Sequence, residues 1–92
     1  MANVVVTLKI MPSDPGIDLN MLEQAAKSRI VDFCNANEFK TVIEPIAFGL
    51  KALKLMFVMD ENKGSTEELE TQISKIEGVE SIECTDVRRT IG

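Results

Sequence analysis

Residues 41–60, TVIEPIAFGLKALKLMFVMD, decide the fold, because they contain two strand-like runs and the connection between them. The second run, residues 50–60, alternates, and the side chains on its predicted buried face are all apolar: Leu53, Leu55, Phe57 and Met59. The first run is shorter, since Pro45 has no N–H for a sheet ladder and Gly49 weakens a strand interior. We therefore expect a strand that begins at Thr41, an interruption over residues 44–49, and a strand over residues 50–60.

Phe48 lies in the middle of that interruption, between Ala47 and Gly49. Its small neighbours offer little for an aromatic ring to pack against. A large aromatic on a connection framed by proline and glycine therefore indicates a tip that is presented to another molecule. The alternative is that Phe48 covers an edge of the sheet.

The segment before this stretch predicts a strand and then a helix. Residues 3–11 alternate, and Pro12, Pro15 and Gly16 then end the strand. Asp18 is a suitable N-cap, and apolar residues recur at helical spacing from residue 19 to about residue 35.

The segment after it predicts a polar turn over residues 60–64, a second helix and a last strand. Ser65 and Glu68 have the spacing of a capping box, and Gly78 suits a left-handed C-terminal cap. Residues 79–87 form the strand, but Val87 is out of phase with Ile82 and Cys84. A bulge near Thr85 or Asp86 would restore the phase.

The predicted order is β-α-β-β-α-β, which is typical of the α+β ferredoxin-like sandwich. Right-handed crossovers place both helices on one face of a four-stranded antiparallel sheet with strand order 4-1-3-2. The other face is then free or covered by a partner. The 92 residues are expected to form a single domain, residues 1–92.

Charge is unevenly distributed along the chain. The formal net charge is −5, and residues 60–86 contain nine acidic and two basic side chains, whereas Arg88 and Arg89 lie near the C-terminus. An acidic chain binds nucleic acid poorly, because phosphates require clustered lysine and arginine. The acidic run is expected to be a solvated face, or else to steer a basic partner surface.

The two cysteines indicate a reduced, cytoplasmic protein. Cys34 and Cys84 are far apart, lack metal-ligand spacing and are expected to be buried thiols. No apolar run is long enough to span a membrane, and no signal peptide is indicated.

Catalytic chemistry has little support in this composition. The chain has no histidine, and it contains no glycine-rich phosphate loop, so an enzyme would depend on carboxylates and lysines alone. We therefore expect no catalytic residue, no bound metal and no cofactor.

Two other functions are compatible with the same topology. An RNA-binding sheet needs exposed aromatics on its central strands, but Phe57 is in phase with the predicted core, so this function is disfavoured. A regulatory module that binds a small molecule as a dimer needs no strong motif and stays an alternative.

The run EPIAFGLKALKL resembles the guanine-nucleotide exchange domain of the translation elongation factor 1-beta family. That family has a proline, a small residue, an aromatic, a glycine and a lysine at the positions of Pro45, Ala47, Phe48, Gly49 and Lys51. The resemblance covers essentially the whole chain, including the acidic turn and the second helix, and is closest to the short archaeal form. Ala52 departs from the family pattern, which has a second lysine there.

The resemblance implies a function and a partner. The chain would promote GDP release from the GTPase elongation factor 1-alpha, would be monomeric when free, and would bind its partner through Pro45, Phe48, Gly49 and Lys51. The aromatic would press against the partner's nucleotide-binding domain. At the extreme C-terminus the family has a lysine that reaches the partner's magnesium site. This chain departs from that pattern, since Arg89 stands near that position and residues 90–92 follow; Arg88 or Arg89 would take over the role. Ordinary surface roles for Lys51, Arg88 and Arg89 stay open.

Overall fold

The computed structural model describes residues 3–36, 38–63 and 65–89 of the chain. Its elements follow the predicted order, as β1 (Asn3–Pro12), α1 (Leu19–Cys34), β2 (Phe39–Pro45), β3 (Lys51–Asp60), the 3₁₀ turn η1 (Glu61–Lys63), α2 (Glu67–Ser74) and β4 (Val79–Arg89).

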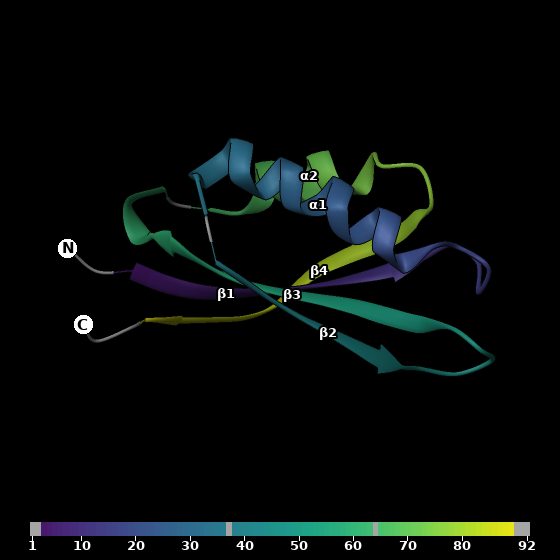
Figure 1. The fold of residues 1–92 in the computed structure, drawn as a ribbon. Coiled ribbons are helices and arrows are strands. Elements are labelled where there is room, and N and C mark those ends of the chain that lie inside the picture. The colour runs from purple at the N-terminus through teal and green to yellow at the C-terminus, as the bar shows by residue number, and fades with distance from the viewer. Residues whose placement is uncertain (1–2, 37, 64, 90–92) are drawn as a thin grey trace.

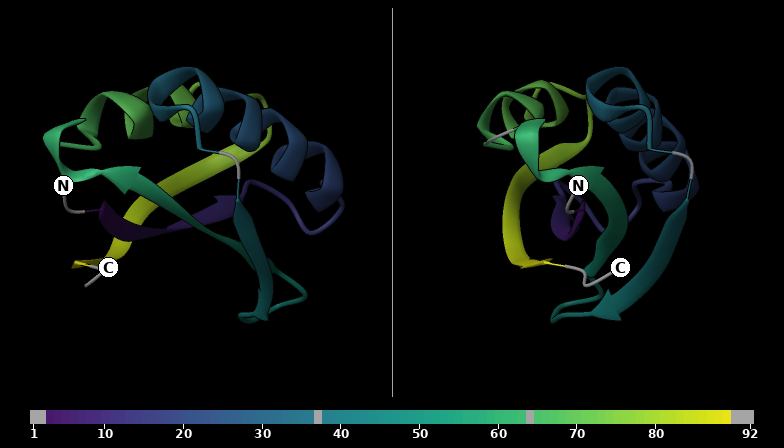
Figure 2. Two further views of the ribbon diagram at one scale, coloured as in Figure 1. Left: turned by 60° about the vertical axis from the view of Figure 1, so that its left-hand side comes forward. Right: turned by 90° about the vertical axis from the view of Figure 1, so that its left-hand side faces the viewer.

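The four strands form one antiparallel sheet in the order β2-β3-β1-β4, which is the predicted order read from the opposite edge. Both helices lie on the same face of this sheet, and the sheet is strongly twisted (Figures 1 and 2). The opposite face carries no helix, as expected for the ferredoxin-like sandwich.

The core lies between the helices and the facing side of β1 and β3. Alternate residues of these two strands are paired across the sheet, for example Val6 with Phe57 and Leu8 with Leu55. These side chains pack against Leu22, Ala26 and Ile30 of α1 and against Leu69 and Ile73 of α2. Phe57 is 1% exposed, which confirms its assignment to the core.

Helix α1 begins and ends where capping chemistry predicts. The Asp18 carboxylate accepts hydrogen bonds from the backbone N–H groups of Asn20 at 2.9 Å and Met21 at 3.4 Å. At the other end Asn35 adopts a left-handed conformation with φ 55°, and its N–H donates to the Val31 carbonyl.

Strand β2 is longer than predicted, since it runs from Phe39 to Pro45, and Glu44 and Pro45 pair with Ala52 and Lys51 of β3. The prediction that Pro45 lies in an interruption of the strand is therefore wrong. β2 is an edge strand and Pro45 is its last residue, and such a position tolerates the missing N–H.

The second helix starts differently from the prediction. Thr66 is its N-cap, and the predicted capping box does not form; instead Ser65 Oγ accepts from the Glu67 N–H at 3.1 Å. Gly78 has the expected positive φ of 98°, but it lies in a separate turn after the helix, closed by the Val79 N–H donating to Ile76. Gly64 of the predicted polar turn lies outside the described residues.

Strand β4 contains the predicted bulge. Thr7 pairs with Asp86 and Leu8 pairs with Cys84, so Thr85 is the extra residue. The bulge keeps Cys84 and Ile82 on the helix side of the sheet, and the strand continues beyond the predicted end to Arg89.

Candidate functional site at the tip of the β2–β3 hairpin

A tight turn closes the β2–β3 hairpin. The Leu50 N–H donates to the Ala47 carbonyl at 2.9 Å, and the Ile46 N–H donates to the Leu50 carbonyl at 2.9 Å. Between them Phe48 and Gly49 have φ values of 55° and 79°. Two successive positive φ angles under such a hydrogen bond are typical of a type I′ turn, whose twist matches that of the flanking strands.

Phe48 combines strain with exposure. A bulky side chain at positive φ is uncommon and costs about 1–2 kcal/mol, because Cβ approaches the following carbonyl oxygen. The Phe48 ring is 97% exposed, so packing within the chain does not offset this cost. The alternative that Phe48 covers a sheet edge is therefore wrong.

The tip projects beyond the rest of the sheet. Strand β1 pairs with β3 only as far as Ile10 and Leu53, and then continues with β4 alone. In Figure 1 the hairpin accordingly extends past the other strands, at the end of the molecule where α1 begins. An open groove of about 400 Å³ separates it from that helix; its lining includes Pro15, Asp18, Gly49 and Lys51.

The predicted site residues of the hairpin lie together around this tip. Pro45 pairs with Lys51 at the base of the connection, and Lys51 is exposed. On the other side of the hairpin the Lys54 ammonium lies 2.6 Å from the Glu44 carboxylate. The hydrogen bond and the charge of Lys54 hold the pKa of Glu44 below its ordinary value.

Arg88 and Arg89 lie at the opposite end of the sheet. Arg89 pairs with Val4, which also pairs with Met59, eight residues along β3 from Lys51. At about 3.3 Å per residue this is a separation of up to about 26 Å. Arg89 Nη2 lies 2.8 Å from Glu61, and Arg88 Nε lies 2.8 Å from Asp86. The structure therefore does not join the arginines and Phe48 in one compact site, and residues 90–92 lie outside its described part.

Both thiols are only partly buried, contrary to the expectation of buried cysteines. Desolvation nevertheless raises the pKa of Cys34 and of Cys84. No helix in the described part of the chain is long and apolar enough to cross a membrane.

Sequence reasoning found the tip but missed its backbone conformation. A glycine in the second central position of a two-residue turn is the available signal, since type I′ turns favour Asn-Gly and Asp-Gly. Phe-Gly departs from that preference, and residue propensity alone does not predict it.

The comparisons with known proteins concern the chain as a whole. Residues 5–90 match the family model described as the EF-1 guanine nucleotide exchange domain. The chain is 45% identical over 89 residues to elongation factor 1-beta of Methanothermobacter thermautotrophicus, covering 97% of this chain and 98% of that protein. It is 42% identical over 90 residues to elongation factor 1-beta of Aeropyrum pernix, again covering 97% and 98%.

Two solved structures share the fold at low sequence identity. A chain described as BlrP1 BLUF has a TM-score of 0.57 at 10% identity, with 100% of this chain and 57% of that chain covered. A putative antibiotic biosynthesis monooxygenase from Bacillus cereus has a TM-score of 0.51 at 11% identity, with 99% and 94% covered. These likenesses concern the arrangement of strands and helices only.

Proposed function

The chain belongs to the EF-1 guanine nucleotide exchange domain family, and from this membership we propose that it promotes GDP release from the GTPase elongation factor 1-alpha during protein synthesis. The Phe48 tip is the part that acts on the partner. The observation that carries this assignment is the ring itself, which is 97% exposed on a backbone of unfavourable φ. Strained residues persist mainly where function requires them.

Exchange follows from differential binding. GDP and Mg²⁺ together order the switch loops of a GTPase. An exchange protein binds the nucleotide-free partner more tightly than the loaded partner. By linkage, the affinity of the partner for nucleotide falls by the ratio of these two affinities. An apolar wedge such as Phe48 favours the rearranged partner, because its ring leaves water only when the partner opens a site for it.

Pro45, Gly49 and Lys51 support this contact. Pro45 and Gly49 set the shape of the turn, and Lys51 adds an exposed cation at the base of the connection. Arg88 and Arg89 form a second contact at the far end of the sheet. To reach a carboxylate or a metal site of the partner, Arg89 exchanges its ion pair with Glu61 for the new one.

The proposed activity breaks no covalent bond, so it needs neither a catalytic residue nor a cofactor of this chain. It requires one protein partner in the cytoplasm, where translation takes place, and neither nucleic acid nor a membrane. A monomer is sufficient, because the tip is complete within one chain. The alternative of a dimeric module that binds a small molecule stays a prediction.

The decisive experiment follows the release of a fluorescent GDP analogue from the cognate elongation factor 1-alpha, with and without this protein. We expect acceleration that saturates with protein concentration. Phe48→Ala should keep the melting temperature and lose most of the acceleration. Val31→Ala on α1, which removes another exposed apolar side chain, should keep the acceleration. Absence of any acceleration at saturating wild-type protein would refute the function, whereas full activity of Phe48→Ala would remove the ring from the site.

A further inference from the structure

The sheet face opposite the helices is apolar along its middle. Alternation along the strands places Val5 of β1, Val42 of β2, and Met56 and Val58 of β3 on this face. Val5 and Val58 are directly paired, and Val58 is 38% exposed. Among the described residues no helix or loop packs over them, so each leaves apolar surface in water (Figure 2).

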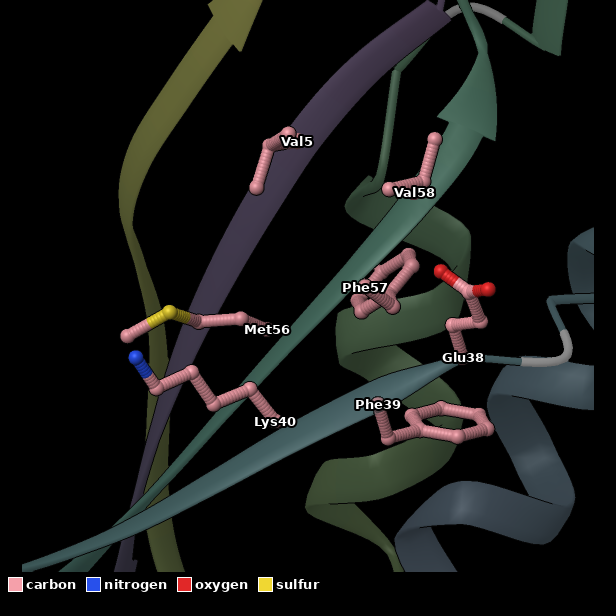
Figure 3. A pocket seen from close by; sticks show the side chains of 7 residues that line it. All are labelled: Val5, Glu38, Phe39, Lys40, Met56, Phe57 and Val58. Carbon is pink, nitrogen blue, oxygen red and sulfur yellow. The ribbon is translucent and has the colours of Figure 1, made fainter.

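An open pocket of about 240 Å³ lies beside Val5, Met56 and Val58, and its lining also includes Phe39 and Lys40. In Figure 3 the side chains of Met56 and Lys40 extend to one side of β3 and β2, and those of Phe57 and Phe39 extend toward the helices. A flexible methionine and the aliphatic stem of a lysine adapt readily to a partner surface.

This face is continuous with the tip. Ile46, two residues before Phe48, is 41% exposed and lines a groove of about 260 Å³ together with Met11 and Lys9. Met11 and Lys9 belong to the same face of β1 as Val5. The open face therefore runs from the tip, past Ile46, Met11 and the paired Lys9 and Lys54, to the pocket beside Val58.

The two faces of the molecule also differ in charge. The strands place four cations on the open face, Lys9, Lys40, Lys54 and Arg88, and four anions, Glu44, Asp60, Glu83 and Asp86, so the charges of this face balance. Since the whole chain has a net charge of −5, the excess of acid lies elsewhere, mostly around α2. Lys9 and Lys40 make no ion pair within the part of the chain that the structure describes.

We propose that the open sheet face is the surface on which the GTPase of the proposed function docks, while the helices face solvent. This inference rests on the proposed function and adds the orientation of the complex. The partner surface that fits is an apolar patch bordered by carboxylates, which would pair with Lys9 and Lys40. Phe48 would enter the partner at one end of this surface.

Two valines of matched exposure on opposite faces allow a direct test. Val58 on the open face is 38% exposed, and Val31 on α1 is 40% exposed. We expect Val58→Glu to raise the half-saturating concentration for GDP release about tenfold or more, because the interface would bury an unpaired carboxylate. Val31→Glu should change it less than about twofold, as a surface substitution outside an interface does. Equal effects of the two substitutions would overturn the proposal.

A second measurement uses the native sequence, so it does not depend on the folding of a variant. Methyl-labelled protein is titrated with the nucleotide-free GTPase, and the methyl signals of Met56 and Met21 are compared by NMR. We expect Met56 to shift or broaden, and Met21, which is 51% exposed on α1, to stay unchanged. If wild-type protein accelerates release but Met56 stays unperturbed, the docking surface is wrong and the proposed function stands; if nothing binds, the function itself fails.

Discussion

At the scale of single residues, Phe48 shows a conflict between folding and the function that we propose for it. The turn requires positive φ at two successive positions, and Gly49 meets this requirement without strain. Phe48 does not, yet its ring contributes almost nothing to the core. Natural sequences accept such local costs chiefly at functional sites.

Phe48→Asn should separate the two demands. Asn-Gly is the preferred pair of a type I′ turn, so we expect the free energy of unfolding to rise by about 1 kcal/mol, measured by urea denaturation. Acceleration of GDP release should fall to the level of Phe48→Ala. A variant that is less stable than wild type would show that the ring contributes to folding after all.

The Glu44–Lys54 pair gives a residue-scale prediction in terms of pH. Lys54→Met should raise the pKa of Glu44 toward its ordinary value, because the hydrogen bond and the charge that lower it are removed. Because the pKa of Glu44 is lower in the folded state, the pair stabilises the fold at pH values above the ordinary pKa of glutamate. This stabilisation is lost as the pH falls through the lowered pKa. An NMR titration of the Glu44 carboxyl carbon measures the shift, and an unchanged titration would contradict this origin.

At the scale of elements, the sequence predicts most of the sheet because burial follows the period of two. The phase break between Cys84 and Val87 predicted a bulge near Thr85 or Asp86, and the structure places it at Thr85. Capping was less predictable: Asp18 acts as expected, but at α2 the N-cap is Thr66 and not the predicted Ser65. The length of β2 was missed, although the predicted strand order already placed this strand at an edge, where a proline is tolerated as the last residue.

Deletion of Thr85 tests the bulge. Cys84 and Asp86 already pair with adjacent residues of β1, so the deletion should keep the register and change the free energy of unfolding by about 1 kcal/mol or less. Deletion of Glu83 is the matched control, because it also removes one residue but leaves Thr85 opposite Leu8 on the helix side and Cys84 opposite Lys9 on the open face, so it should cost more than deletion of Thr85. Similar losses in the two variants, measured by urea denaturation, would contradict the assigned register.

At the scale of the whole molecule, the candidate contacts lie at the two ends of the sheet. The sequence indicated Phe48 and the two arginines separately, but their separation is a property of strand order and register. Because β3 and β4 both run away from the tip, any residue near the end of β4 lies far from Phe48. The type of residue carries no information on this distance.

The distance predicts independent contributions. We expect Arg89→Ala to weaken the acceleration of GDP release by itself, and Phe48→Ala with Arg89→Ala to combine additively within about 0.5 kcal/mol of activation free energy. Stopped-flow release rates for the four proteins of this cycle give the coupling. If Arg89→Ala releases GDP at the wild-type rate, Arg89 does not contact the partner, and its role is the ion pair with Glu61.

The overhang of the β2–β3 hairpin beyond the last β1–β3 pair also bears on how such domains diversify. Within the described part of the chain, residues 45–51 form hydrogen bonds only within the hairpin and pair with no strand of the core, so this segment can be replaced as a unit. Exchange of this segment between relatives should therefore transfer the proposed partner contact and leave the core unchanged.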